Sequence, residues 1–152
     1  MTDLTHLDAE GRARMVDVGG KPPMHRTAIA VGTLVAAPAT LDRLLAGDLP
    51  KGEAVAVARV AGIQAAKRCD ALIPLCHTLP LDAASIDFER RDPDRLAVIA
   101  RAVVTARTGV EMEALTGASV ALLTLWDMAK GVDPDLRIED VRLIEKRKEP
   151  TA

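Results

Sequence analysis

Ionisable side chains gather in residues 109–130, GVEMEALTGASVALLTLWDMAK. Glu111 and Glu113 open a predicted helix, where the positive end of the helix dipole favours carboxylates. Near its end, Asp127 and Lys130 are three positions apart, so their side chains can pair. A purely structural explanation is available: the two glutamates would stabilise the start of the helix, and Asp127 and Lys130 would form a surface ion pair. Asp127, however, opposes the dipole and interrupts an apolar stretch, so we expect it to have a partner or a function.

The spacing of these charges limits what they can do together. On one unbroken helix, the fourteen positions from Glu113 to Asp127 span ~21 Å. Lys51 and Lys67 stand at opposite ends of an earlier predicted helix, ~24 Å apart. One small reacting centre therefore cannot contact both members of either pair. Either the ligand is long or the site is built from more than one subunit, and we favour a subunit interface.

Another candidate lies in residues 72–81, LIPLCHTLPL, where two prolines obstruct both helix and strand. These prolines fix His77 in a short apolar loop. A lone histidine is commonly satisfied by backbone groups, and the alternative is an acid–base or ligand-binding imidazole. Cys69 and Cys76 lack the paired spacing of metal ligands, so we expect no metal site. We interpret Cys76 as a small buried hydrophobe.

Composition narrows the choice of ligand. The 152-residue chain has a net charge of −2, one Phe and one Trp, which argues against nucleic acid as a partner. A phosphorylated ligand would need local cations such as Lys51, Lys67, Lys130 and residues 146–148. No P-loop, dinucleotide-binding glycine motif or nucleophile elbow occurs. The chain shows no signal peptide and no membrane-spanning apolar run, so we expect a cytoplasmic protein with no membrane partner.

Hydrophobic patterning predicts the fold that positions these residues. Strands rich in β-branched or alternating residues are predicted at 24–36, 83–90, 95–107 and 137–146. Helices with apolar residues at helical spacing are predicted at 38–47, 52–68 and 111–130. With the early helices counted as one layer element, this order is a ferredoxin-like βαββαβ sandwich, an α+β fold with an antiparallel sheet and an extra helix. The second face of the sheet has few aromatics to cover it, which favours an oligomer.

The predicted domain organisation is simple. Residues 1–152 form a single domain, because no repeat, linker or low-complexity tract divides them. Residues 1–22 lack a sustained period and contain GGKPP, which predicts an irregular N-terminal arm. Residues 147–152 are expected to form a mobile tail after the last strand.

Three stretches resemble the MoaC family of molybdenum-cofactor biosynthesis, over about residues 4–146: LTHLDAEGRARMVDV, KGEAVAVARVAGIQAAKRCDALIPLCHTLPL and TGVEMEALTGASVALLTLWDMAKGV. The resemblance implies a homo-hexamer, a trimer of dimers, with active sites at subunit interfaces. It implies a lyase that is a cyclic pyranopterin monophosphate synthase. The implied substrate is 3′,8-cyclo-7,8-dihydro-GTP from a radical-SAM partner enzyme, and the implied products are cyclic pyranopterin monophosphate and pyrophosphate.

The resemblance also implies roles for individual residues. Asp127 matches an acid–base position, and Lys51 and Lys130 match catalytic lysines for proton transfer or phosphate charge. The substrate-binding positions are matched by Leu75, Cys76, His77, Met112, Glu113, Glu111, Arg26 and Lys67. No protein-bound metal and no resident cofactor is implied, and Mg²⁺ accompanying the polyphosphate is left open.

Two departures from the family pattern stand out. Thr78 follows His77, where the family usually has proline. After the last strand the chain reads EKRKEPTA, where the family commonly continues with a GGKSG-like segment. Lys146, Arg147 and Lys148 are candidate substitutes for the lysine of that segment. The second departure keeps an alternative open, a non-catalytic oligomeric module that binds a nucleotide or pterin as a regulatory ligand.

Overall fold

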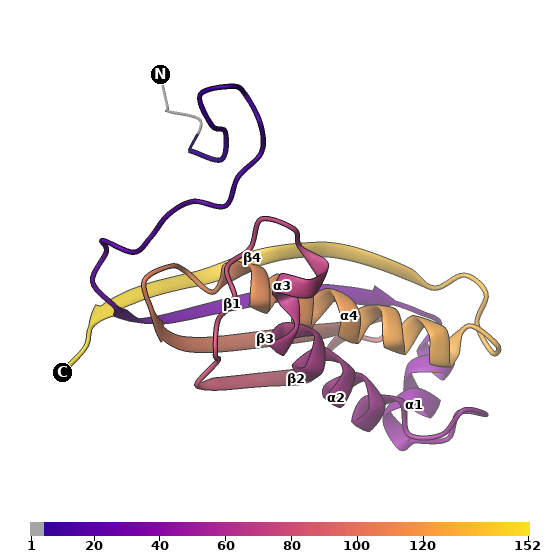
Figure 1. The fold of residues 1–152 in the computed structure, drawn as a ribbon. Coiled ribbons are helices and arrows are strands. Elements are labelled where there is room, and N and C mark those ends of the chain that lie inside the picture. The colour runs from indigo at the N-terminus through magenta and orange to yellow at the C-terminus, as the bar shows by residue number, and fades with distance from the viewer. Residues whose placement is uncertain (1–4) are drawn as a thin grey trace.

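One antiparallel sheet forms the first layer of this protein, with its strands in the order β2-β3-β1-β4 (Figure 1). The computed structural model describes residues 5–152. The strands are β1 (Met24–Val35), β2 (Ala83–Asp92), β3 (Arg95–Ala106) and β4 (Arg137–Pro150). The helices are α1 (Pro38–Ala46), α2 (Ala54–Lys67), α3 (Cys69–Leu72) and α4 (Glu111–Ala129). The predicted α+β class and four-stranded antiparallel sheet are confirmed.

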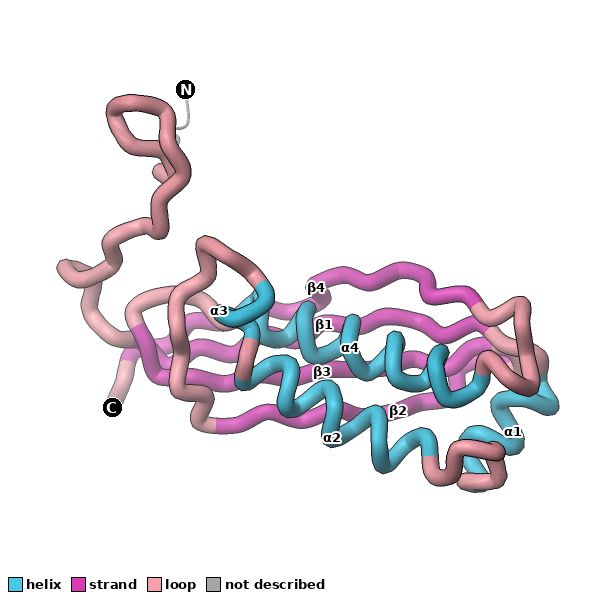
Figure 2. Tube along the Cα trace, turned by 45° about the vertical axis from the view of Figure 1, so that its right-hand side comes forward, coloured by secondary structure: helices cyan, strands magenta, loops and turns pink. Residues whose placement is uncertain are grey.

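Helices α2 and α4 lie side by side across the same face of the sheet (Figure 2). They approach closely because glycines face each other: a Cβ on Gly62 would lie 2.9 Å from the carbonyl oxygen of Gly117. Other small side chains of the two helices are fully buried, namely Ala58, Ala114, Ala118 and Ala121. This close packing fixes the direction of α4, and with it the positions of the charged residues at its two ends.

The C-terminal strand is longer than its sequence pattern predicts. The pattern ends the last strand at residue 146, whereas β4 continues to Pro150. Arg147 and Lys148 pair through the backbone with Thr27 and Arg26 of β1. An edge strand can pair through its backbone without apolar side chains. The charged composition of residues 147–150 is therefore compatible with a strand, although it is also typical of a tail. Residues 147–150 therefore belong to the sheet and not to a mobile tail.

An N-terminal arm leaves the two layers beside the loop that follows α3 (Figure 1). Residues 5–23 contain no helix and no extended strand, only an isolated β-bridge between Leu7 and Ala13. The first four residues of the predicted arm lie outside the described residues. Among the described helices, none combines the length and apolar character needed to cross a membrane.

Candidate active site

Two lysines surround Asp127 at the C-terminal end of α4. Asp127 Oδ2 lies 2.9 Å from Lys51 Nζ, and Oδ1 lies 2.8 Å from Lys130 Nζ. Lys51 Nζ also donates to the backbone oxygen of Asp127 at 3.2 Å. Because α2 and α4 run in opposite directions, the turn before α2 that carries Lys51 lies beside the end of α4 (Figure 2). That turn is closed by Gly52, whose φ of +98° favours glycine.

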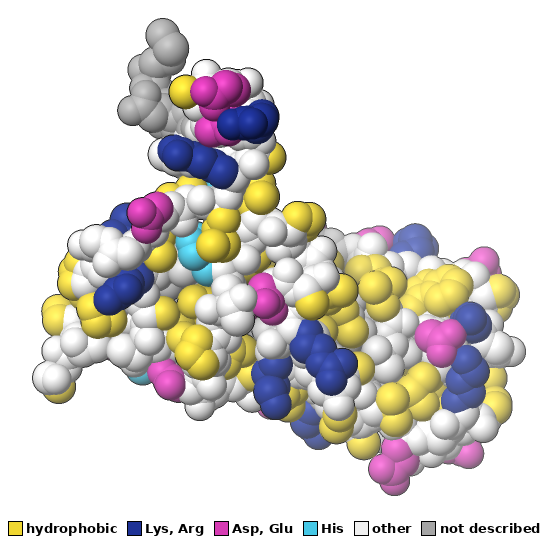
Figure 3. Space-filling view, viewed as in Figure 1, with side chains coloured by type: hydrophobic (Ala, Val, Ile, Leu, Met, Phe, Trp, Pro, Cys, Tyr) yellow, Lys and Arg dark blue, Asp and Glu magenta, His cyan; other side chains and the backbone are white. Residues whose placement is uncertain are grey.

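The paired lysines determine the protonation state of Asp127. Hydrogen bonds from Lys130 and from Lys51 lower its pKa from 3.8 to about 2. Asp127 is therefore ionised at neutral pH, where it accepts hydrogen bonds and does not donate a proton. Each of the three side chains is about half exposed, so an anionic ligand can reach the lysines. Cationic and acidic side chains are seen together at this end of the molecular surface (Figure 3).

A second charged group lies at the N-terminal end of α4. Glu111 forms an ion pair with Lys146 of β4. Burial acts to raise the pKa of Glu111, but the Lys146 hydrogen bond and the charge of Arg26 outweigh it and lower that pKa. Arg26 also donates to the backbone oxygens of Ala106 and Arg107, at 3.2 and 3.3 Å. Lys146, Arg147 and Lys148 are the candidate substitutes for the lysine of the family's GGKSG-like segment, and of these Lys146 is the one paired with Glu111.

Glu113 is buried beside two thiols, with only 2% of its surface exposed. Its Oε1 lies 3.7 Å from Cys76 Sγ, which in turn lies 3.9 Å from Cys69 Sγ. Burial raises the pKa of Glu113; burial and then the nearby Glu113 charge raise the pKa of Cys76 to about 12. Cys76 is thus a half-buried hydrogen-bond donor and not the small buried hydrophobe that its sequence context favoured.

The loop between α3 and β2 holds His77 against the N-terminal arm. His77 Nε2 lies 2.6 Å from the backbone oxygen of Val16, so one of its two ring nitrogens has a backbone partner. Thr78 Oγ1 donates to Asp70 Oδ2 at 2.7 Å and ties the loop to α3. This hydrogen bond anchors the loop at the position where the family usually has proline.

A cavity of about 330 Å³ lies between this loop, the arm and the start of α4. In the space-filling view, a histidine side chain is visible in the hollow at the foot of the arm (Figure 3). The cavity brings together five residues that the sequence predicted to bind substrate: Leu75, Cys76, His77, Glu111 and Met112. Lys21 of the arm also lines it. The arm is therefore one wall of the candidate site.

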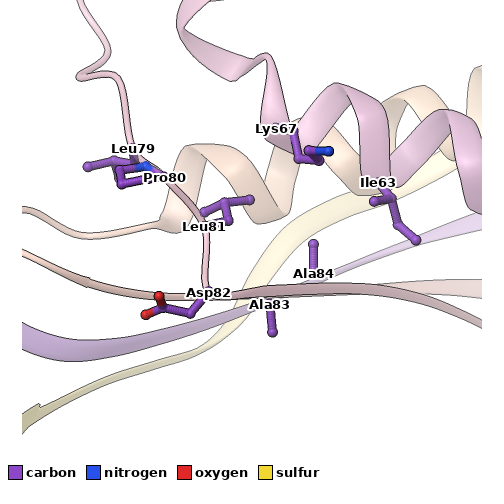
Figure 4. A pocket seen from close by; sticks show the side chains of 8 residues that line it. All are labelled: Ile63, Lys67, Leu79, Pro80, Leu81, Asp82, Ala83 and Ala84. Carbon is purple, nitrogen blue, oxygen red and sulfur yellow. The ribbon is translucent and has the colours of Figure 1, made fainter.

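Lys67, the last residue of α2, belongs to neither of the charged groups at the two ends of α4. It lines a separate cavity of about 400 Å³ with seven other residues, Ile63, Leu79, Pro80, Leu81, Asp82, Ala83 and Ala84 (Figure 4). Leu79 lines both this cavity and the one beside His77. The charged ends of Lys67 and Asp82 point in different directions in this view (Figure 4). The structure thus places Lys67 next to the His77 cavity but outside its lining.

The predicted residues therefore fall at separate places along one helix. Because α4 is continuous from Glu111 to Ala129, Glu113 and Asp127 are ~21 Å apart along its axis. The expectation that they cannot contact the same small group is confirmed. Sequence reasoning did not foresee that Cys69 joins Glu113, because their proximity depends on the fold and no local pattern marks it.

A four-stranded antiparallel sheet covered on one face by two paired helices, with charged groups at both ends of one helix, defines this chain as an α+β protein with a candidate ionic site. The MoaC family model matches residues 15–149, so the chain belongs to the MoaC family. It is 56% identical over 147 residues to a cyclic pyranopterin monophosphate synthase of Novosphingobium aromaticivorans, covering 97% of this chain and 93% of that protein.

Other relatives carry the same name. The chain is 56% identical over 146 residues to the cyclic pyranopterin monophosphate synthase of Chloroflexus aggregans, covering 95% of this chain and 88% of that protein. It is 50% identical over 143 residues to cyclic pyranopterin monophosphate synthase 3 of Mycobacterium bovis, covering 94% of this chain and 81% of that protein. These alignments extend over both ends of α4, and the resemblance seen in the sequence is confirmed.

Proposed function

We propose that this protein is a cyclic pyranopterin monophosphate synthase of molybdenum-cofactor biosynthesis. It converts 3′,8-cyclo-7,8-dihydro-GTP, supplied by a radical-SAM enzyme, to cyclic pyranopterin monophosphate and pyrophosphate. The observation that carries the proposal is the open cluster of Asp127, Lys51 and Lys130 at the end of α4. Two exposed cations at 2.8–2.9 Å from one carboxylate can meet the charge of a polyphosphate.

The lysine end is suited to the phosphate step. A sugar oxygen attacks the α-phosphorus and loses its proton, and the bond from phosphorus to the pyrophosphate oxygen breaks with its electron pair. Negative charge therefore grows on the leaving pyrophosphate, where ammonium groups lower the barrier. We assign Lys51 and Lys130 to this charge and to proton transfer, and Asp127 to holding them and accepting a proton. Mg²⁺ bound to the polyphosphate would also stabilise the negative charge on the leaving pyrophosphate.

The other end of α4 is suited to the heterocycle. Leu75 and Met112 offer apolar walls, while His77, Cys76, Glu111 and Glu113 offer hydrogen-bonding groups for a ring that must gain and lose protons. Arg26 and Lys67 supply positive charge around this region.

We assign the two ends to different subunits of a ferredoxin-like homo-hexamer, a trimer of dimers. The ~21 Å between Glu113 and Asp127 supports this arrangement, because one chain does not bring them to a common atom. Each active site would then take its lysine end from one chain and its His77 cavity from a neighbour.

The test supplies the purified protein with freshly generated cyclised dihydro-GTP and follows pyranopterin and pyrophosphate. Wild type is compared with Asp127→Ala and with Asp48→Asn, which removes an exposed carboxylate 3.8 Å from Arg43 as a matched control. We expect product from wild type and Asp48→Asn, and at least a ~100-fold loss in folded Asp127→Ala. Ligand binding without product in all three would instead support the non-catalytic regulatory module.

A further inference from the structure

Three atoms that bind metals in other proteins converge beneath the loop that carries His77. They are Cys69 Sγ of α3, Cys76 Sγ of the loop and a carboxylate oxygen of Glu113 in the first turn of α4, all within 4.8 Å of one another. The two sulfurs are 3.9 Å apart, and Cys76 Sγ is 3.7 Å from Glu113 Oε1. The grouping joins three elements that are separate in the sequence.

These distances match the edges of a tetrahedral zinc site. With Zn–S near 2.3 Å, tetrahedral geometry separates two sulfurs by about 3.8 Å. With Zn–O at 2.0–2.2 Å, a sulfur and an oxygen are separated by about 3.5–3.7 Å. The Cys69–Cys76 and Cys76–Glu113 separations depart from these values by only about 0.1 Å, and the third pair, Cys69 Sγ and a Glu113 carboxylate oxygen, lies within 4.8 Å.

An independent observation also points to a bound cation. Glu113 is 2% exposed, and its Oε2 has no hydrogen-bond partner in the described part of the chain. Within residues 5–152, no lysine, arginine or histidine forms an ion pair with this carboxylate. An unsatisfied buried carboxylate oxygen is costly, and a cation held between it and the two sulfurs would remove that cost.

The surroundings of the cluster are those of a metal site. The Thr116 hydroxyl lies 3.4 Å from Cys69 Sγ and can orient that ligand from outside, as hydrogen-bonding partners of metal ligands commonly do. Cys76 is half-buried and lines the 330 Å³ cavity at the foot of the arm, which gives an ion a route to the cluster. Two sulfurs with one oxygen favour a borderline or soft ion over Mg²⁺ or Ca²⁺.

We propose that Cys69, Cys76 and Glu113 bind one Zn²⁺-class divalent cation, with a fourth position left for water or a ligand atom. The bound ion links α3, the His77 loop and α4. Because Cys76 and Glu113 are also assigned to substrate binding, Zn²⁺ and the substrate ring would compete for these two side chains. The inference does not rest on the proposed synthase activity, since its test measures the metal itself.

The test titrates untagged, full-length, metal-free protein with Co²⁺ under anaerobic, thiol-reduced conditions. Thiolate ligation gives a sulfur-to-cobalt charge-transfer band and intense tetrahedral d–d bands. We expect these bands to saturate at one equivalent and to disappear when Zn²⁺ displaces Co²⁺. At a hundredfold excess of Zn²⁺ over its Kd, the Tm of the protein is expected to rise by roughly 5–10 °C.

Variants separate this site from adventitious binding. Cys69→Ser and Glu113→Gln, each checked for its fold by circular dichroism, are expected to weaken Co²⁺ binding at least ~10-fold, and Cys69→Ser also to reduce the charge-transfer band. Asp48→Asn is the matched control, because this exposed carboxylate pairs with Arg43 and lies outside the cluster, and it should bind as wild type does. Absence of the band in reduced wild type, or an undiminished band in Cys69→Ser, would overturn the proposal.

Discussion

Subunit complementation tests whether the two ends of α4 serve one active site. Glu113 and Asp127 are ~21 Å apart on a single unbroken helix, so one chain does not present both to a small reacting centre. Asp127→Asn removes the charge that pairs with Lys51 and Lys130, while Glu113→Gln neutralises the buried carboxylate at nearly constant shape. If the two residues act in different halves of a shared site, mixed oligomers of the two variants contain some sites with both halves intact.

Random assembly determines the size of the effect. Each variant alone is expected to lose at least ~100-fold in kcat, the usual cost of removing an acid–base or charge-stabilising group. At equal amounts, about one site in four takes its Asp127 half from a Glu113→Gln chain and its Glu113 half from an Asp127→Asn chain. The mixture should therefore recover up to about a quarter of wild-type activity, more than about 20-fold above either variant alone.

The assay uses co-expressed chains with two different tags, so that only mixed assemblies are isolated, and follows pyrophosphate release. A second mixture, Asp127→Asn with Lys130→Ala, is the control, since both changes fall in the same half and no mixed site is intact. We expect that control to stay inactive. If the first mixture also stays inactive although its assemblies carry both tags, the two ends of α4 do not combine across subunits and the reasoning from helix length is refuted.

Further predictions concern packing and charge. Gly62→Ala places a methyl group 2.8 Å from Ile86 Cγ1 between α2 and the sheet, so the free energy of unfolding should fall by about 1–3 kcal/mol in denaturant titration. Gly20→Ala meets nothing within 4 Å and should change it by less than about 0.5 kcal/mol; equal effects would contradict the packing argument. Lys130→Ala removes the largest cause of the low pKa of Asp127, so carboxyl NMR titration should show that pKa rising from about 2 toward 3.8. Because folding lowers this pKa, the stabilisation by the ion pairs is fully present above about pH 3.8 and is lost as pH falls through about 2.

The elements of the fold were predictable from local patterns because burial imposes those patterns. The apolar residues of 111–129 recur at helical spacing, and the structure has one helix there with carboxylates in its first turn. The extension of β4 to Pro150 was not predictable, since backbone pairing with β1 leaves no hydrophobic alternation in a charged edge strand. The short helix α3 was missed because its four residues are fewer than a periodic pattern requires.

The candidate site was predictable as residues but not as geometry. Lys51 and Asp127 are 76 positions apart, and their contact exists because α2 and α4 pack in opposite directions. That packing depends on small residues such as Gly62 and Gly117, whose partners no sequence pattern identifies. Cys69 lies beside Glu113 because of the same packing: it is the first residue of α3, the short helix that follows α2.

The low pKa of Asp127 places a condition on the proposed reaction. A carboxylate with a pKa of about 2 is a weak proton acceptor, because the two lysines already stabilise its charge. A polyphosphate competes for the same ammonium groups, and each lysine drawn toward phosphate stops lowering that pKa. Ligand binding should therefore make Asp127 more basic at the moment when the attacking hydroxyl must lose its proton. Carboxyl NMR titration with bound pyrophosphate measures this directly: we expect the pKa to move upward toward 3.8, and an unchanged pKa with pyrophosphate bound would remove Asp127 as the proton acceptor.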